Sequence, residues 1–298
     1  MTKSRPGQEK TPGWLPWTSL VTATRVRSPK TERSGPPSTG SAAELNLTSN
    51  LLYVLTVAGR FDQVEQRAGE LLELGGAAAG IDVRPLHFRL SAVAALRGDT
   101  DRARAHADHC LDLADGDDVQ NVAMAASLEA ALALAEGDYS RALGAASKAI
   151  DIGVMDLQIP SHESVRAGFP DAVDAALAVG DLDAADGLVA LFAERPPGDV
   201  LPFLRMHARR ARALAAAARA DDDTVGDVLA AVETAFAELG YRYWQARTQL
   251  DLAEWFAGVG RLDEATAQAE GAAVTFEELR VTPMAARARR VRVPARPG

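Results

Sequence analysis

Cysteine, aromatic residues and lysine are all scarce in this sequence of 298 residues. Cys110 is the only cysteine, so no disulfide can form within the chain, and we expect a protein of the reducing cytoplasm. Aromatic residues make up 5% of the sequence, whereas a β-sandwich or barrel needs many more of them, together with Val, Ile and Thr. An all-β fold is therefore excluded. No run of about 18 uninterrupted apolar residues occurs, so we expect no membrane-spanning helix.

Alanine is abundant instead, with 59 residues, or about one in five. Because alanine has the highest intrinsic helix propensity and a small side chain, this composition predicts closely packed helices. Arginine outnumbers lysine by 28 to 4, a bias typical of GC-rich bacterial genomes. The sequence therefore predicts an all-α protein from a bacterium.

The first 40 residues differ from the rest of the chain. They contain six prolines, seven basic residues and two acidic ones, whereas residues 41–298 contain 25 basic and 39 acidic residues. Such a segment buries too little apolar surface to offset the entropy lost on ordering, so we predict a disordered tail at 1–40. A signal peptide is the competing interpretation, but the apolar patch at 14–17 is short and split by Pro16. A mis-assigned start codon or a remnant of a longer upstream protein is favoured.

A short glycine-centred motif recurs along residues 41–292. Its glycines are 39, 39, 43 and 80 residues apart, and because the last gap is twice 40 we expect a sixth, degenerate turn near Ala220, in the segment 219–223. The segment 236–239 also recurs 40 residues later, at 276–279, which supports the register. The five glycines are Gly59, Gly98, Gly137, Gly180 and Gly260.

Each position of the motif has a mechanical role in a helical hairpin. The glycine ends the first helix in a left-handed conformation, and an Asp, Ser or Thr shortly afterwards caps the second helix. A small residue five positions after the glycine allows the two helices to cross closely, and in the first copy Val64 takes this place. These small residues are Ala103, Ala142, Ala185 and Ala265. We predict a repeat array of such hairpins over 41–292, followed by a short disordered tail at 293–298.

The turn at 137–142, Gly-Asp-Tyr-Ser-Arg-Ala, resembles the tetratricopeptide (TPR) consensus, and the likeness extends over roughly 42–292. The period of about 40 exceeds the usual 34, and the proline that often follows the second TPR helix appears only at Pro197. The chain is more similar to the long-helix TPR-like arrays of bacterial signalling ATPases, in LuxR-type regulators and in ATPase-linked adenylate/guanylate cyclases. Residues 243–255 are most similar to the cyclase-linked arrays.

The resemblance implies a right-handed superhelical solenoid of about six hairpins with a concave binding groove. The first helix of each hairpin would line this groove. We expect these first helices at 44–58, 84–96, 119–135, 163–179, 203–219 and 241–257.

Motifs that carry catalytic chemistry are missing from the sequence. There is no phosphate-binding Gly-x-x-x-x-Gly-Lys-Ser/Thr loop, and beyond residue 40 the only lysine is Lys148. His106, His109 and Cys110 cannot easily surround a tetrahedral metal ion, so we interpret them as a buried cysteine beside two surface histidines. We therefore expect no catalytic residues, no metal and no cofactor.

Two groups of residues are candidates for partner binding. Arg205, Arg209 and Arg212 form a helical stripe able to bind phosphates or an acidic peptide; the alternative is a solvated face balanced by the acidic residues 221–223. Tyr243 and Trp244 are candidate interface anchors, or else core residues near the end of the array. The terminal arginines at 287–292 could contact nucleic acid, but the net charge of −14 over 41–298 argues against a nucleic-acid partner.

These observations favour a non-catalytic interaction or sensor module. The expected partner is a protein or peptide in the groove, with a cyclase or ATPase domain as the regulated part, and no membrane or nucleic acid. The resemblance suggests the C-terminal repeat region of a signalling ATPase/nucleotide cyclase. The alternative is the truncated repeat region of a LuxR-type transcriptional regulator, and a third hypothesis is an enzyme with an unrecognised site in the groove.

Overall fold

A computed structural model describes residues 42–73, 82–113, 118–193, 195–196, 198–220 and 224–291. The tails predicted at 1–40 and 293–298, together with Pro197 and the acidic residues 221–223, lie outside the described residues. The chain divides into two units, Met1–Thr39 and Gly40–Gly298, and all the structure reported below belongs to the second.

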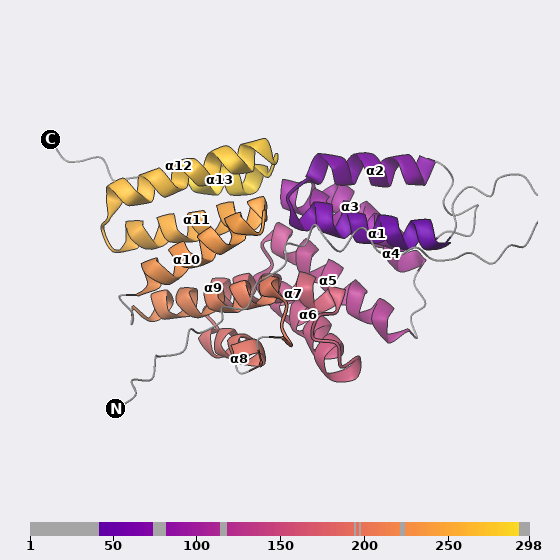
Figure 1. Cartoon of the computed structure of the whole chain (residues 1–298), viewed down its shortest axis with the longest axis horizontal. Coiled ribbons are helices and arrows are strands. Elements are labelled where there is room, and N and C mark those ends of the chain that lie inside the picture. Colours follow the sequence, from indigo (N-terminus) through magenta and orange to yellow (C-terminus); the bar gives the residue numbers. More distant parts are fainter. Residues whose placement is uncertain are drawn as a thin grey trace, which may run out of the picture. The chain divides into compact units, whose positions relative to one another are not determined.

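The described part of the second unit consists mainly of helices (Figure 1), and the predicted all-α class is confirmed because none of the described residues lies in a strand. The first helices of the successive hairpins are α1 (Ala42–Val57), α3 (Arg84–Arg97), α5 (Val119–Glu136), α7 (Glu163–Val179), α9 (Pro202–Arg219) and α11 (Arg242–Gly258). The second helices are α2 (Phe61–Glu73), α4 (Thr100–Asp112), α6 (Tyr139–Asp151), α8 (Leu182–Ala193), α10 (Val225–Glu238) and α12 (Leu262–Glu278). A π-helical turn, η2 (Ile152–Asp156), extends α6, and α13 (Thr282–Arg290) follows α12. Within the described part of the chain, no helix combines the length and apolar character needed to cross a membrane.

The turn glycines adopt the backbone conformation that their position requires. All five have positive φ, between 73° at Gly59 and 83° at Gly98. Ala220, which stands where the sixth glycine would be, also takes the left-handed conformation, with φ of 54°. The side chains of Asp99, Asp138 and Asp181 then accept hydrogen bonds from backbone N–H groups three residues later, and so cap the following helices.

The small residues after the glycines lie where consecutive helices meet. Ala103, Ala142 and Ala185 are completely buried, and Ala265 is 2% exposed. Val64, the larger residue in the first copy, is also completely buried. Each hairpin therefore packs tightly about its corner, and neighbouring helices pack along the chain.

The N-terminal and C-terminal helices of the unit share one hydrophobic core. Leu52 and Phe61 belong to the same buried cluster as Phe276 and Leu279. An ion pair of 2.7 Å between Arg280 and an Asp62 carboxylate, 218 residues apart in sequence, lies at the same junction. In Figure 1 the ends of the yellow α12 and α13 accordingly face the ends of the indigo α2 and purple α3, and α13 contacts α3. The first and last hairpins of the unit are therefore in contact, and the repeat period alone does not predict this contact.

Gly98 offers a test of this junction. A Cβ at Gly98 would lie 2.7 Å from Cγ of Pro283 on α13, whereas a Cβ at Gly137 would meet nothing within 4 Å. Both glycines have left-handed φ, so each Gly→Ala change costs about 1 kcal/mol of backbone strain. Gly98→Ala is expected to lower the free energy of unfolding by a further 1–3 kcal/mol or so, because α13 must move. Urea denaturation of both variants measures this difference, and equal losses would show that α13 does not pack on this turn.

Candidate functional site: a cavity lined by the first helices

A cavity of about 680 Å³ lies within the second unit. Its wall is formed mainly by the first helices of the hairpins and by α13, with α2 and α6 contributing Phe61 and Tyr139. Much of the wall is apolar or aromatic, and charged side chains interrupt it at a few points. A cavity of this size and character is suited to a small molecule or a short peptide.

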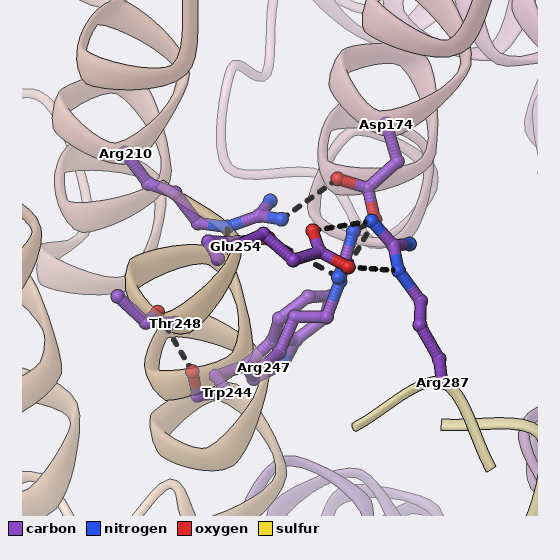
Figure 2. A network of polar contacts seen from close by, with 8 residues as sticks. Asp174, Arg210, Trp244, Arg247, Thr248, Glu254 and Arg287 are labelled. Carbon is purple, nitrogen blue, oxygen red and sulfur yellow. Dashed lines mark hydrogen bonds and ion pairs between the residues drawn. The ribbon is translucent and has the colours of Figure 1, made fainter. Parts of the chain in front are cut away.

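A closed ring of four charged side chains lies at this wall, and Figure 2 labels three of them, Asp174, Arg210 and Arg247; the fourth is Asp251. Arg210 on α9 donates from Nε to Asp251 over 2.6 Å and from Nη2 to Asp174 over 2.9 Å. Arg247 on α11 lies 3.2 Å from the other Asp174 oxygen and 3.1 Å from Asp251. The ring joins α7, α9 and α11, and therefore three successive hairpins.

Burial makes this ring sensitive to the loss of any member. The side chain of Arg210 is completely buried, and that of Asp251 is 3% exposed. Burial by itself would raise the pKa of Asp174, but the charges of Arg210 and Arg247 outweigh it and hold the pKa well below its usual value. Asp174 is therefore ionised at neutral pH and paired with two arginines, in a place where an unpaired charge is very costly.

Most other charged groups of the wall are also paired. Glu254 accepts two hydrogen bonds from Arg287 of α13, at 2.6 and 2.7 Å, as Figure 2 shows. Arg89 pairs with Glu163, and Glu136 pairs with two surface arginines. These ion pairs link helices that are distant in sequence, and they neutralise most of the charged side chains that line the cavity.

Asp171 and Arg166, both on α7, are exceptions. Neither has an ion-pair partner among the described residues, and the exposed Arg290 is the other unpaired charge of the wall. Burial and the neighbouring charge of Asp174 raise the pKa of Asp171 to about 8. Arg166 stacks over the ring of Tyr53, with its guanidinium carbon 4.1 Å from the ring centroid, and its Nε is buried without a hydrogen-bond partner.

The candidate residues from the sequence fall in two places. Tyr243 and Trp244 line the cavity, where Tyr243 is 5% exposed and packs in the same core that joins the two ends of the unit. Arg205, Arg209 and Arg212 do not line it. Arg209 and Arg212 are exposed, and Arg205 is half-buried with a contact to the Pro196 carbonyl. The structure thus separates the aromatic candidates from the arginine stripe.

A third histidine, His87 on α3, lies beside His106 and His109, and the sequence pattern did not predict this contact. Nδ1 of His87 on α3 lies 3.0 Å from Nδ1 of His106, and its ring also faces exposed His109 at 5.0 Å between centroids. Cys110 is 7% exposed, and burial raises the pKa of its thiol to about 11. Within the described ranges, no group of three or more His, Cys, Asp or Glu side chains is arranged to hold a metal ion.

The four members of the ring do not stand out in the sequence. Arg210 is adjacent to Arg209, and the sequence pattern singles out Arg209 for the candidate stripe but not Arg210. A usable signal is present, because Asp174 lies in the alanine-rich C-terminal half of its helix. Arg247 and Asp251 are likewise spaced four apart, as an ion pair on one helix face requires. Charges at positions that the repeat assigns to an inner face are therefore the sign of such a ring.

No protein-family model matches this chain, and no curated protein is significantly similar to it in sequence.

Proposed function

We propose that this chain is a non-catalytic sensor or interaction module and that the cavity is its binding site. In this proposal the hairpins form a TPR-like, right-handed superhelical array of about six units, whose first helices present the binding surface. The observation that carries the proposal is the cavity of about 680 Å³, to which every hairpin contributes its first helix.

This arrangement suits sensing. A ligand in the cavity touches several hairpins at once, so its binding energy depends on how they are arranged. Any difference in affinity between two arrangements of the hairpins is a coupling free energy that a neighbouring domain can use. Most charged groups of the wall are held in ion pairs with one another, which favours a structural and binding role over acid–base catalysis.

The regulated partner in this proposal is the catalytic part of a signalling ATPase linked to a nucleotide cyclase, in the cytoplasm of a bacterium. Support comes from residues 243–255, the stretch most similar to the cyclase-linked arrays. This stretch supplies the wall with Tyr243, Trp244, Arg247, Asp251 and Glu254. The acidic balance of residues 41–298 favours a protein, peptide or small molecule over nucleic acid as the partner.

Filling the cavity tests the proposal. Ala131 on α5 lines the cavity and is half-buried, whereas Ala105 on α4 is exposed and lies outside it. The full chain and the variants Ala131→Trp and Ala105→Trp are purified from the cells that produce the protein, and bound molecules are identified by native mass spectrometry. We expect the native chain and Ala105→Trp to retain the same ligand and Ala131→Trp to lose it.

Circular dichroism confirms that each variant is helical before its ligand is scored. Retention by Ala131→Trp equal to that of the native chain would contradict the proposal, as would a folded native chain that retains nothing.

A further inference from the structure

One acidic and one basic residue of the cavity wall, both on α7, have no ion-pair partner among the described residues. Asp174 and Asp251 are neutralised by two arginines, and the remaining acidic residues of the wall have ion pairs of their own. Asp171 alone among these acids lacks one in the described part of the chain. Arg166 has only the face of Tyr53.

The two unpaired groups both line the cavity but do not bind each other. They are five residues apart on α7, which corresponds to a rise of about 7.5 Å along the helix. No ion pair joins them, and the charge of Arg166 does not contribute to the pKa of Asp171. Pro170 lies between them and has no N–H, so the carbonyl of Arg166 lacks its usual helical donor.

Apolar side chains occupy the wall around these charges. Ala167, Leu177 and Ala178 on α7 line the cavity, and Tyr243 and Trp244 face it from α11. The apolar middle of a ligand, or one with small side chains, fits such a surface, and charged groups at its two ends could pair with Asp171 and Arg166.

We propose that the cavity binds a zwitterionic chain molecule, whose ammonium group pairs with Asp171 and whose carboxylate pairs with Arg166. The two charges of the ligand are separated by several bonds, as in an ω-amino acid or a short peptide with free ends. This inference rests on the proposed function, because it names the ligand class of the same cavity.

Binding of such a ligand is linked to a proton. Because the pKa of Asp171 is raised to about 8, its carboxyl group is mostly protonated at pH 7 and must lose the proton to pair with an ammonium group. Of the neighbouring titratable groups, Asp174 has its pKa held well below the usual value and Tyr243 has its pKa raised. Neither titrates between pH 6 and 8, while Arg210 and Arg247 stay charged.

Isothermal titration calorimetry of the full chain tests the inference with two zwitterions, 6-aminohexanoate and trialanine. The matched single-charge compounds are hexylamine, hexanoate and N-acetyl-trialanine. We expect the zwitterions to bind at least tenfold more tightly than the single-charge compounds. We also expect the affinity for 6-aminohexanoate to rise about tenfold per pH unit between pH 6 and 7.5, with release of one proton. Comparison of the two zwitterions distinguishes a free amino acid from a peptide as the source of the ligand.

Variants then assign the two ends of the ligand. Asp171→Asn is expected to weaken zwitterion binding at least tenfold and to abolish its pH dependence, whereas Arg166→Gln weakens binding but keeps the pH dependence. Asp108→Asn and Arg209→Gln, which remove exposed charges outside the cavity, are expected to bind as the native chain does.

The inference is overturned if hexylamine or hexanoate binds as well as 6-aminohexanoate, or if neither Asp171→Asn nor Arg166→Gln weakens binding. Its failure is distinguishable from failure of the proposed function. If the native chain retains a ligand that Ala131→Trp loses, but no zwitterion binds in the calorimetry, the cavity is still a binding site. In that case only the zwitterionic class of its ligand is refuted.

Discussion

Replacing Arg210 with methionine is expected to lower the free energy of unfolding by about 3–5 kcal/mol. Arg210 is completely buried and holds Asp174 and Asp251 through hydrogen bonds of 2.9 and 2.6 Å. Methionine is unbranched like the arginine stem but carries no charge, so the variant leaves the ring with two carboxylates and only Arg247 to balance them. Removal of one member of a buried ion-pair network leaves an uncompensated charge, which explains the size of the expected loss.

Arg209→Met is the matched control, because Arg209 is the adjacent residue on α9 and is exposed. We expect it to change the free energy of unfolding by less than about 0.5 kcal/mol. Urea denaturation of both variants at pH 7 gives the comparison. Similar losses in the two variants would show that the ring does not stabilise the fold.

Asp171→Asn is expected to have the opposite effect and to stabilise the protein at pH 7. An aspartate has a pKa of about 3.9 in an unfolded chain, whereas burial and the charge of Asp174 raise the pKa of Asp171 to about 8 in the fold. Between these two values the folded state binds more protons than the unfolded state, so stability falls as the pH rises from about 4 to 8. Asparagine is neutral at every pH and removes this loss.

The difference in unfolding free energy between Asp171→Asn and the native chain should therefore be small near pH 4 and grow with pH. The growth is at most about 1.4 kcal/mol per pH unit and ends near pH 8. Urea denaturation at several pH values measures it, with Asp108→Asn on the exposed face of α4 as the control. A difference that does not change with pH would mean that Asp171 is ionised in the fold across this range.

Local sequence was sufficient for the helices and their corners. A glycine followed by a capping aspartate determines its own turn, because both effects act within one turn of chain. The degenerate turn departs from this rule: Ala220 stands where the repeat places a glycine and still takes a left-handed φ of 54°, so the period predicted this corner and the residue type did not. The first helices likewise fall close to the ranges expected from the repeat, with α7 at Glu163–Val179.

Local sequence could not separate Arg209 from Arg210, although they are neighbours in the same helix. The side chain of a residue one position further along a helix points about 100° away, so one arginine meets water and the other meets two carboxylates on other hairpins. Which of them is buried depends on where α7 and α11 lie, and the repeat pattern of α9 contains no information on that point.

By itself, therefore, the sequence determined the helical class and the corners of the hairpins, because these follow from short-range backbone and packing preferences. The tertiary structure decided the rest. The contact of α2 and α3 with α12 and α13 joins residues some 200 positions apart, and the ring of Arg210, Arg247, Asp174 and Asp251 forms only when three hairpins meet. The unpaired charges of Asp171 and Arg166 become evident only once every other acid of the cavity wall has found its partner, because pairing is a property of the whole fold.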